Sequence, residues 1–471
     1  MTLIETTDKP APASDISLIP EQVAALRTSF ESGKTRPLAW RRGQLQALDQ
    51  LVSEGSGELL EALKQDLRKP ALEAWSADVG FVKQEVRLTL KKLAKWTRPE
   101  RVATPIHLRP AKSRIVREPL GVVLIIAPWN YPVQLLLGPL VGAIAAGNCA
   151  VLKPSEVAAH TSGVLAKLVR RYLDPECFAV FEGGVPETQA ILAERFDHVF
   201  YTGNGSVARE VMTAAARFLT PVTLELGGKS PCIIDRDVDL EVAARRIAWG
   251  KFMNAGQTCI APDYVLVHRE RENDLIEALR RTLREFYGED PGRSQDFARI
   301  PNVRHHRRLA ALLKDGDVAV GGQTDEADGY IAPTVLRNPK PDSPLMTDEI
   351  FGPILPVLAV DDVAAAIEYV NQRPKPLALY LFSNDAKAEE QVLSGTSSGG
   401  VCVNSTLFHI ANPELPFGGV GPSGMGAYHG RATFELFSHH KSVLTRGTRF
   451  DPKLMYPPYT KLKAALLKRL A

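Results

Sequence analysis

Residues 221–262, PVTLELGGKSPCIIDRDVDLEVAARRIAWGKFMNAGQTCIAP, carry the chain from a predicted strand to a cysteine turn. A β-rich run ends at the carboxylate of Glu225 and passes into a double glycine. Apolar residues at helical spacing predict a helix over 240–254, and a Gly-Gln-Thr turn then leads to Cys259. If the fold brings carboxylate and thiol together, they form a plausible base and nucleophile. A buried structural cysteine beside a surface glutamate is the alternative, and it is the common outcome for a lone cysteine.

Upstream of this stretch, apolar strands alternate with helical segments, which is typical of a doubly wound parallel sheet. The predicted strands are Val122–Ala127, Cys149–Leu152, Cys177–Phe181, His198–Thr202 and Val222–Leu226. The predicted helices are Leu135–Ala146, Glu156–Tyr172, Glu187–Arg195 and Ser206–Leu219. Ligands of such sheets bind at the carboxyl ends of the strands, so a ligand site is expected there.

A second series of strands and helices fills residues 228–418. Its strands include Tyr264–Val267, Ala378–Phe382 and Gly400–Val403, and its helices include Asp274–Phe286, Val363–Asn371 and Lys387–Leu393. Residues 18–98 have helical periodicity, whereas the proline-containing segment 99–120 suits an extended arm or hairpin.

The composition excludes several classes of protein. A length of 471 residues suggests two or three domains, and a net charge of +3 gives no argument for nucleic-acid binding. The five cysteines form no CxxC pair, so neither a metal site nor a disulfide framework is expected, and a cytoplasmic location fits. Residues 1–15 lack the features of a signal peptide and are expected to be a disordered lead-in. The apolar stretch 121–146 is interrupted by three prolines, which favours a strand, loop and helix over a membrane span.

Several motifs, in order along roughly residues 20–445, resemble the aldehyde dehydrogenase superfamily and in particular its class 3 branch, which includes the fatty aldehyde dehydrogenases. The stretches that carry the resemblance are Glu225–Pro231 with Gly256–Cys259, Pro128–Pro132, Leu152–Glu156, Glu349–Pro353, Pro416–Gly421 and Ser423–Gly426.

This resemblance implies an α/β aldehyde dehydrogenase fold made of a Rossmann-like parallel-sheet cofactor domain, an α/β catalytic domain and a small β oligomerisation arm. The expected boundaries are 1–98 and 120–227 for the NAD(P)-binding domain, 228–418 for the catalytic domain, 99–119 and 419–450 for the bridging segments, and 451–471 for a C-terminal tail. A homodimer that uses the arm and the C-terminal strand as its contact is also implied.

The resemblance further implies NAD(P)-dependent oxidation of medium- to long-chain aliphatic or aromatic aldehydes to carboxylic acids. Cys259 would form a thiohemiacetal and then a thioester, and Glu225 would activate the hydrolytic water. The side-chain amide of Asn130 and the backbone N–H of Cys259 would stabilise the oxyanion. A free glutamate has a pKa of about 4.3, so burial would have to raise the pKa of Glu225 for this role.

A dinucleotide fingerprint, Gly-x-Gly-x-x-Ala, begins at Gly203 and continues through Gly205 and Ser206. Taken alone, this motif would assign Glu225 to the ribose, but the resemblance assigns the adenosine ribose to Lys153 and Glu156. The other cofactor contacts it implies are Trp129, Leu226, Gly227, Glu349 and Phe351. Because a carboxylate at position 156 should repel a 2′-phosphate, NAD is expected to be preferred, with some use of NADP.

Two other classes of function stay open. One is a cysteine acyl hydrolase without redox chemistry, although none of the ten histidines occupies a motif. The other is a semialdehyde or acyl-CoA-forming dehydrogenase, against which the presence of Glu225 argues. Tyr131 and the helix around Trp75–Phe81 are expected to line the substrate channel, with Phe408 and His409 on another wall. The basic tail is expected to pack on protein, with weak membrane-surface contact as the alternative.

Overall fold

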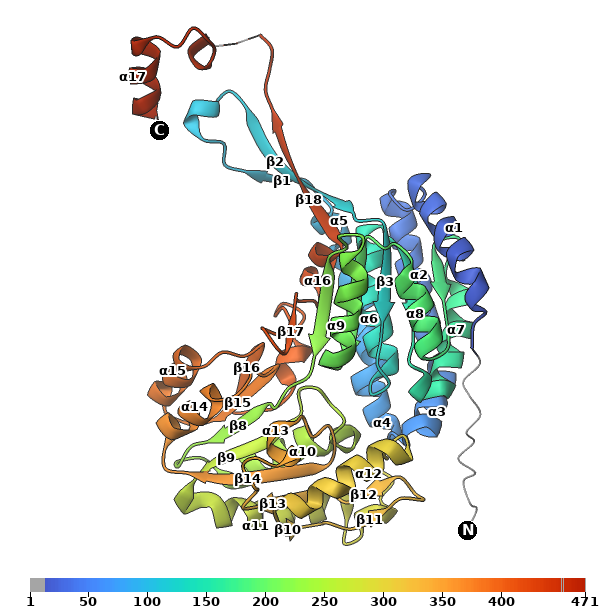
Figure 1. Cartoon of the computed structure of the whole chain (residues 1–471), viewed down its shortest axis with the longest axis vertical. Coiled ribbons are helices and arrows are strands. Elements are labelled where there is room, and N and C mark those ends of the chain that lie inside the picture. The colour runs from blue at the N-terminus through green and yellow to red at the C-terminus, as the bar shows by residue number, and fades with distance from the viewer. Residues whose placement is uncertain (1–12, 450, 452, 471) are drawn as a thin grey trace.

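Two helix-covered sheets and a projecting arm make up the molecule (Figure 1). The computed structural model describes residues 13–449, 451 and 453–470. The first sheet has six strands in the order β17-β7-β6-β3-β4-β5, parallel except for β17. The second has seven strands in the order β10-β13-β14-β9-β8-β15-β16, parallel except for β10. The α/β fold predicted from the sequence is therefore confirmed.

The first sheet is built from the N-terminal half of the chain and one short C-terminal strand. Its strands are β3 (Val122–Ile126), β4 (Cys149–Lys153), β5 (Phe178–Val180), β6 (His198–Gly203), β7 (Val222–Leu226) and β17 (Gly424–Met425). The helices around it are α1 (Ile19–Glu31), α2 (Leu38–Glu54), α3 (Ser56–Leu67), α4 (Ala71–Ala74), α5 (Gly80–Trp96), α6 (Pro132–Ala146), α7 (Ala159–Tyr172), α8 (Val185–Ala193), α9 (Gly205–Ala216) and α16 (Arg431–Leu436).

The second sheet follows directly after β7. Its strands are β8 (Pro231–Ile234), β9 (Tyr264–His268), β10 (Asp317–Val320), β13 (Thr334–Arg337), β14 (Ile354–Val360), β15 (Ala378–Phe382) and β16 (Gly400–Val403), with a separate hairpin of β11 (Thr324–Asp325) and β12 (Tyr330–Ile331). Its helices are α10 (Leu240–Phe252), α11 (Glu272–Tyr287), α12 (Val303–Leu312), α13 (Pro344–Thr347), α14 (Val363–Asn371) and α15 (Ala386–Gly395). Because only residues 227–230 separate β7 from β8, the double glycine lies where the chain crosses from one sheet to the other.

The most apolar stretch of the sequence forms the central strand β3 of the first sheet and the helix α6 that packs against it. All five residues of β3 and all fifteen of α6 are buried, which explains why this segment is apolar on every side. Among the described residues, no helix combines the length and the apolarity that crossing a bilayer requires. The strand, loop and helix expected for residues 121–146 are confirmed.

Several element boundaries differ from the sequence-based expectation. The helix expected to begin at Glu156 begins with a 3₁₀ turn, Glu156–Ala158, because the Ser155 side chain caps Val157 and α7 starts only afterwards. Helix α10 ends at Phe252, two residues early, because the backbone becomes left-handed at Asn254. Residues 1–12 of the expected disordered lead-in lie outside the described part. At its end the expectation is wrong: the backbone N–H of Ser14 donates to the Glu182 carbonyl at 3.0 Å.

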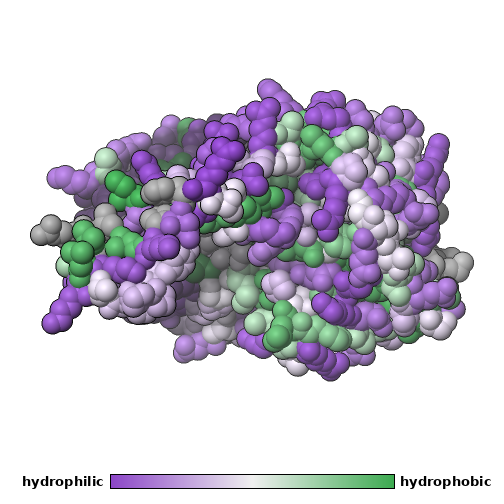
Figure 2. Space-filling model, turned by 90° about the horizontal axis from the view of Figure 1, so that it is seen from above, coloured by the Kyte–Doolittle hydropathy of each residue, from purple (hydrophilic) through white to green (hydrophobic). Residues whose placement is uncertain are grey.

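The predicted bridging segments divide between the arm and the body. Strands β1 (Glu100–Val102), β2 (Lys112–Pro119) and β18 (Ser438–Thr445) form the arm, and β18 pairs with β2 along its whole length. The earlier part of segment 419–450 lies in the body instead, since β17 pairs with β7 and α16 packs against α6. Helix α17 (Lys461–Leu470) lies beyond the arm, away from both sheets (Figure 1). From this end the surface is largely hydrophilic, with smaller hydrophobic patches (Figure 2).

Candidate active site

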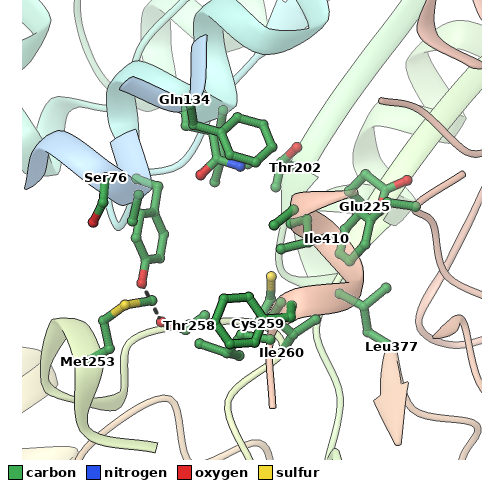
Figure 3. A pocket seen from close by; sticks show the side chains of 18 of the residues that line it. Ser76, Gln134, Thr202, Glu225, Met253, Thr258, Cys259, Ile260, Leu377 and Ile410 are labelled. Atoms are coloured by element: carbon green, nitrogen blue, oxygen red, sulfur yellow. Dashed lines mark hydrogen bonds between the residues drawn. The ribbon is translucent and has the colours of Figure 1, made fainter. Parts of the chain in front are cut away.

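Two cavities meet at the end of the cysteine turn. One, of about 200 Å³, is lined mainly by apolar side chains, and the other, of about 480 Å³, runs along the carboxyl ends of the first sheet. Cys259, Glu225 and Thr202 line both cavities. Figure 3 shows the Cys259 sulfur directed into the first cavity, with Thr202 and Glu225 across from it. The thiol and the carboxylate that are thirty-four positions apart in the chain are therefore brought to one junction.

The cysteine lies beyond a turn of unusual backbone conformation. Asn254, Ala255 and Gly256 have φ values of 52°, 51° and 73°, all in the left-handed region. A Cβ atom on Gly256 would lie 2.2 Å from the Gly352 carbonyl oxygen, so only glycine fits there. Burial, together with the negative charges of Glu349 and Glu225, raises the pKa of the Cys259 thiol, while backbone N–H groups at 259 and 260 oppose that rise.

Glu225 is the second reactive group at the junction. It is on β7, is buried, and neither of its carboxylate oxygens has a hydrogen-bond partner within the described residues. Burial raises its pKa well above the usual value of 4.5. An unpartnered carboxylate with a raised pKa beside a cavity is suited to take a proton from a nearby water.

Asn130 is buried next to the cysteine turn. Its side-chain Nδ2 donates to the Gln257 backbone carbonyl at 2.9 Å, and its backbone carbonyl accepts from Lys69 Nζ at 2.8 Å and Asn254 Nδ2 at 2.9 Å. An amide nitrogen carries two hydrogens, so one remains for an oxyanion. Asn130 lines the larger cavity, which Cys259 also lines.

The larger cavity contains most of the predicted cofactor contacts. The predicted cofactor contacts that line this cavity are Trp129, Lys153, Glu156, Gly203, Leu226, Gly227, Glu349 and Phe351. Gly205 and Ser206 do not line it; they form the first turn of α9, and the cavity is instead lined on this side by Asn204 and Val207. Asn204 is the N-cap of α9, and its side chain accepts from the Val207 N–H at 3.0 Å.

Charged groups mark the two ends of this cavity. Lys153 Nζ lies 3.8 Å from Glu156 Oε2, and burial lowers the pKa of the Lys153 ammonium. Burial and the negative charge of Asp263 raise the pKa of Glu349 to about 8. A Cβ on Gly227 would lie 2.0 Å from Glu349 Oε2, so the glycine is needed for this carboxylate to reach the cavity. Polar groups at both ends and a long cavity between them fit a dinucleotide.

Sequence reasoning missed part of the cavity wall. The additional lining residues are Gly184, Val185, Thr188, Gln189 and Leu192 around α8, and Arg304, His305 and Arg308 on α12. A usable signal was present for α8, because Gly183-Gly184-Val185-Pro186 follows a buried strand and opens a helix. No comparable signal marks α12, which reaches the cavity from the second sheet.

The smaller cavity matches the expected substrate channel in most positions. Ser76, Ala77, Phe81, Tyr131 and Phe408 line it, as predicted. His409 does not, and that expectation is wrong. Its ring packs against Tyr380 and Phe417 at centroid distances of 6.0 Å, because the Phe408–Ala411 turn directs neighbouring side chains to opposite sides.

The residues of this wall that sequence reasoning missed include Trp249, Met253, Leu377, Ile410, Phe417 and Tyr428.

Comparison with known proteins agrees with this geometry. The model described as "Aldehyde dehydrogenase family" matches residues 9–443. The mouse protein "Aldehyde dehydrogenase, dimeric NADP-preferring" is 50% identical over 447 residues, covering 94% of this chain and 98% of its own length. Mouse "Aldehyde dehydrogenase family 3 member A2" is 49% identical, covering 95% and 93%. The solved structure "Substrate bound state of Staphylococcus Aureus AldH" has a TM-score of 0.94 and 45% identity, covering 96% and 99%.

Proposed function

Since the chain belongs to the aldehyde dehydrogenase family and is an NAD(P)-dependent aldehyde dehydrogenase, we propose that Cys259 is its nucleophile, Glu225 its base and Asn130 its oxyanion donor. One observation carries this assignment: Cys259 and Glu225 line both cavities, so a substrate in one and a dinucleotide in the other would meet at these two groups.

The reaction follows from the positions of these groups. The Cys259 thiol loses its proton to solvent, and the thiolate adds to the aldehyde carbon. The resulting oxyanion accepts hydrogen bonds from the Asn130 side-chain amide and the Cys259 backbone N–H. A bound nicotinamide dinucleotide supplies the acceptor for the hydride that leaves the carbon. Glu225 then takes a proton from a water that attacks the thioester, and the carboxylic acid leaves as the thiol is restored.

We propose that NAD is preferred and that NADP is also accepted. Glu156 supports this preference because its carboxylate can accept from ribose hydroxyls and would repel a 2′-phosphate. Lys153, 3.8 Å away, acts in the opposite direction and supports some use of NADP. The mouse relative is named NADP-preferring, so the preference for NAD needs a direct measurement. A kcat/KM ratio in favour of NADP, measured with one aldehyde, would refute it.

The chemistry of the smaller cavity supports apolar aldehydes as substrates, namely medium- to long-chain aliphatic or aromatic ones. Its wall is mostly aromatic and aliphatic, so burial of substrate carbon drives binding. The test is the NADH absorbance produced from a C2–C18 aldehyde series and benzaldehyde, with both cofactors. Turnover that is highest for C2 and falls with chain length would contradict the proposal.

We further propose a cytoplasmic homodimer whose contact includes the arm. The supporting observation is β18, an outer strand of the arm whose residues are mostly exposed. The mouse relative is named dimeric. Helix α17, with Leu462 and Leu466 exposed among lysines, keeps weak membrane-surface contact as the alternative role of the tail. Sedimentation of the full chain tests the dimer, and flotation with liposomes tests the tail.

A further inference from the structure

The turn before Cys259 adopts a conformation that its own residues do not favour. Glycine adopts a left-handed backbone freely and asparagine tolerates it, but alanine is uncommon there. Ala255 is nevertheless held at a φ of 51° and is buried. Contacts from outside the turn must therefore hold this shape, and because Cys259 follows three residues after Gly256, the same contacts determine where the thiol lies.

The contact to the turn backbone comes from the other half of the molecule. Glu73 Oε1 accepts a hydrogen bond of 2.7 Å from the backbone N–H of Asn254, which is 181 positions later in the chain. Glu73 belongs to α4, directly before the π-helical turn Trp75–Val79. Ser76 of that turn lines the aldehyde cavity. The carboxylate thus joins the wall of the substrate cavity to the backbone that carries the nucleophile.

The side chain of Asn254 continues this connection to the oxyanion donor. Asn254 Nδ2 donates to the carbonyls of Asn130 at 2.9 Å and Gln257 at 3.2 Å, and the Gln257 carbonyl also accepts from Asn130 Nδ2 at 2.9 Å. A shift of Asn254 would therefore move the Asn130 amide and the start of the cysteine turn together. Lys69, in a buried ion pair with Asp78, also donates to the Asn130 backbone carbonyl, at 2.8 Å.

We propose that Glu73 is a positioning residue for aldehyde oxidation: by accepting the Asn254 N–H, it keeps turn 254–256 left-handed and so fixes Cys259 relative to the Asn130 amide. The inference rests on the proposed roles of Cys259 and Asn130. Glu73 acts through Asn254 and lines neither cavity.

Two substitutions separate hydrogen bonding from charge. Glu73→Gln retains an oxygen that can accept, so kcat and the rate at which iodoacetamide alkylates Cys259 should stay close to those of the wild type. Glu73→Ala should lower kcat by about ten- to a hundredfold, because small misplacements of reacting groups have effects of this size. It should slow the alkylation of Cys259, located by mass spectrometry, while KM for NAD stays unchanged. The matched control is Glu58→Ala, which removes an exposed carboxylate paired with Lys167.

A third substitution tests the backbone argument. Ala255→Gly makes the left-handed conformation inherently accessible, so the double variant Glu73→Ala/Ala255→Gly should recover most of the lost kcat and alkylation rate. A role that is only structural would lower the melting temperature without this recovery.

The inference is wrong if Glu73→Ala has wild-type kcat and wild-type alkylation, whatever its melting temperature. Should that variant not fold, Glu73→Asp serves instead, because its shorter side chain cannot reach Asn254; full kcat and alkylation in Glu73→Asp would overturn the inference equally. The proposed function is tested separately. Turnover by Cys259→Ala would show that Cys259 is not the nucleophile. An inactive Cys259→Ala together with a fully active Glu73→Ala would contradict only the positioning role of Glu73.

Discussion

The two cavities that meet at Cys259 differ in what their walls can do. The smaller one has an aromatic and aliphatic wall, which favours any apolar chain of suitable size without fixing its orientation. The larger one places Lys153 and Glu156 at one end and Glu349 at the other, charged groups that can form hydrogen bonds with hydroxyls. One side of the thiol therefore selects by burial and the other by hydrogen bonding, and substitutions on each side should affect different kinetic constants.

Removing the junction itself should have the largest effect. Cys259→Ala eliminates the thiol at the junction of the two cavities, so aldehyde oxidation should fall by at least about 10³-fold, as expected for loss of a nucleophile. NAD should still bind, since the larger cavity is otherwise intact. The measurements are NADH production and NAD titration by protein fluorescence. Appreciable turnover would show that Cys259 is not the nucleophile.

Glu225→Gln keeps the shape of the junction but removes the proton acceptor. Hydrolysis of the thioester should slow by about 10²- to 10⁴-fold, the usual contribution of a general base, and acylation should slow less. Rapid mixing should then show a burst of NADH followed by a slow phase, and mass spectrometry should find the acylated Cys259. Steady-state rates equal to the wild type would exclude the role.

Glu349→Gln tests the larger cavity, where the dinucleotide is proposed to bind. KM for NAD should rise by about tenfold, consistent with the loss of a hydrogen bond, while KM for the aldehyde should change little. Because the pKa of Glu349 is raised to about 8, the folded protein favours its protonated form. Its contribution to the free energy of unfolding is therefore present at low pH and is lost as the pH rises from about 4.5 to 8.

The melting temperature of the Glu349→Gln variant, measured from pH 5 to pH 8.5, should accordingly fall less with rising pH than that of the wild type. Parallel profiles for the two proteins would contradict the assigned pKa shift.

Trp249→Ala should have the smallest effect and should be confined to the aldehyde side. Trp249 lines the smaller cavity and stacks on Phe408 with ring centroids 5.2 Å apart, yet 38% of its surface is exposed. Loss of this partly buried surface should lower kcat/KM for decanal by about threefold and leave KM for NAD unchanged. An increase in KM for NAD would show that the two sides are not independent.

Sequence motifs correctly located the residues that meet at the junction of the two cavities, whereas the exact ends of helices and turns were predicted less well. Glu225 could be found because it lies near the end of a strand, directly before the double glycine, and Cys259 because it follows the turn that contains Gly256. The fingerprint could not show that Asn204 and Val207 line the cavity while Gly205 and Ser206 do not, because the motif does not specify which residues of the first helical turn face a ligand. His409 was misplaced for a similar reason, since one residue along a tight turn reverses the direction of a side chain.

By itself, the amino-acid sequence determined the α/β class, the order of strands and helices, and the identity of the thiol and the carboxylate. These properties follow from periodicity and motifs, which involve only residues that are close together in the sequence. Only the tertiary structure decided that both groups line the same two cavities, that α8 and α12 complete the cofactor wall, and that Glu73 reaches the backbone of Asn254. Such contacts join residues that are far apart in the chain. They depend on how the two sheets pack together, and no local sequence pattern specifies that packing.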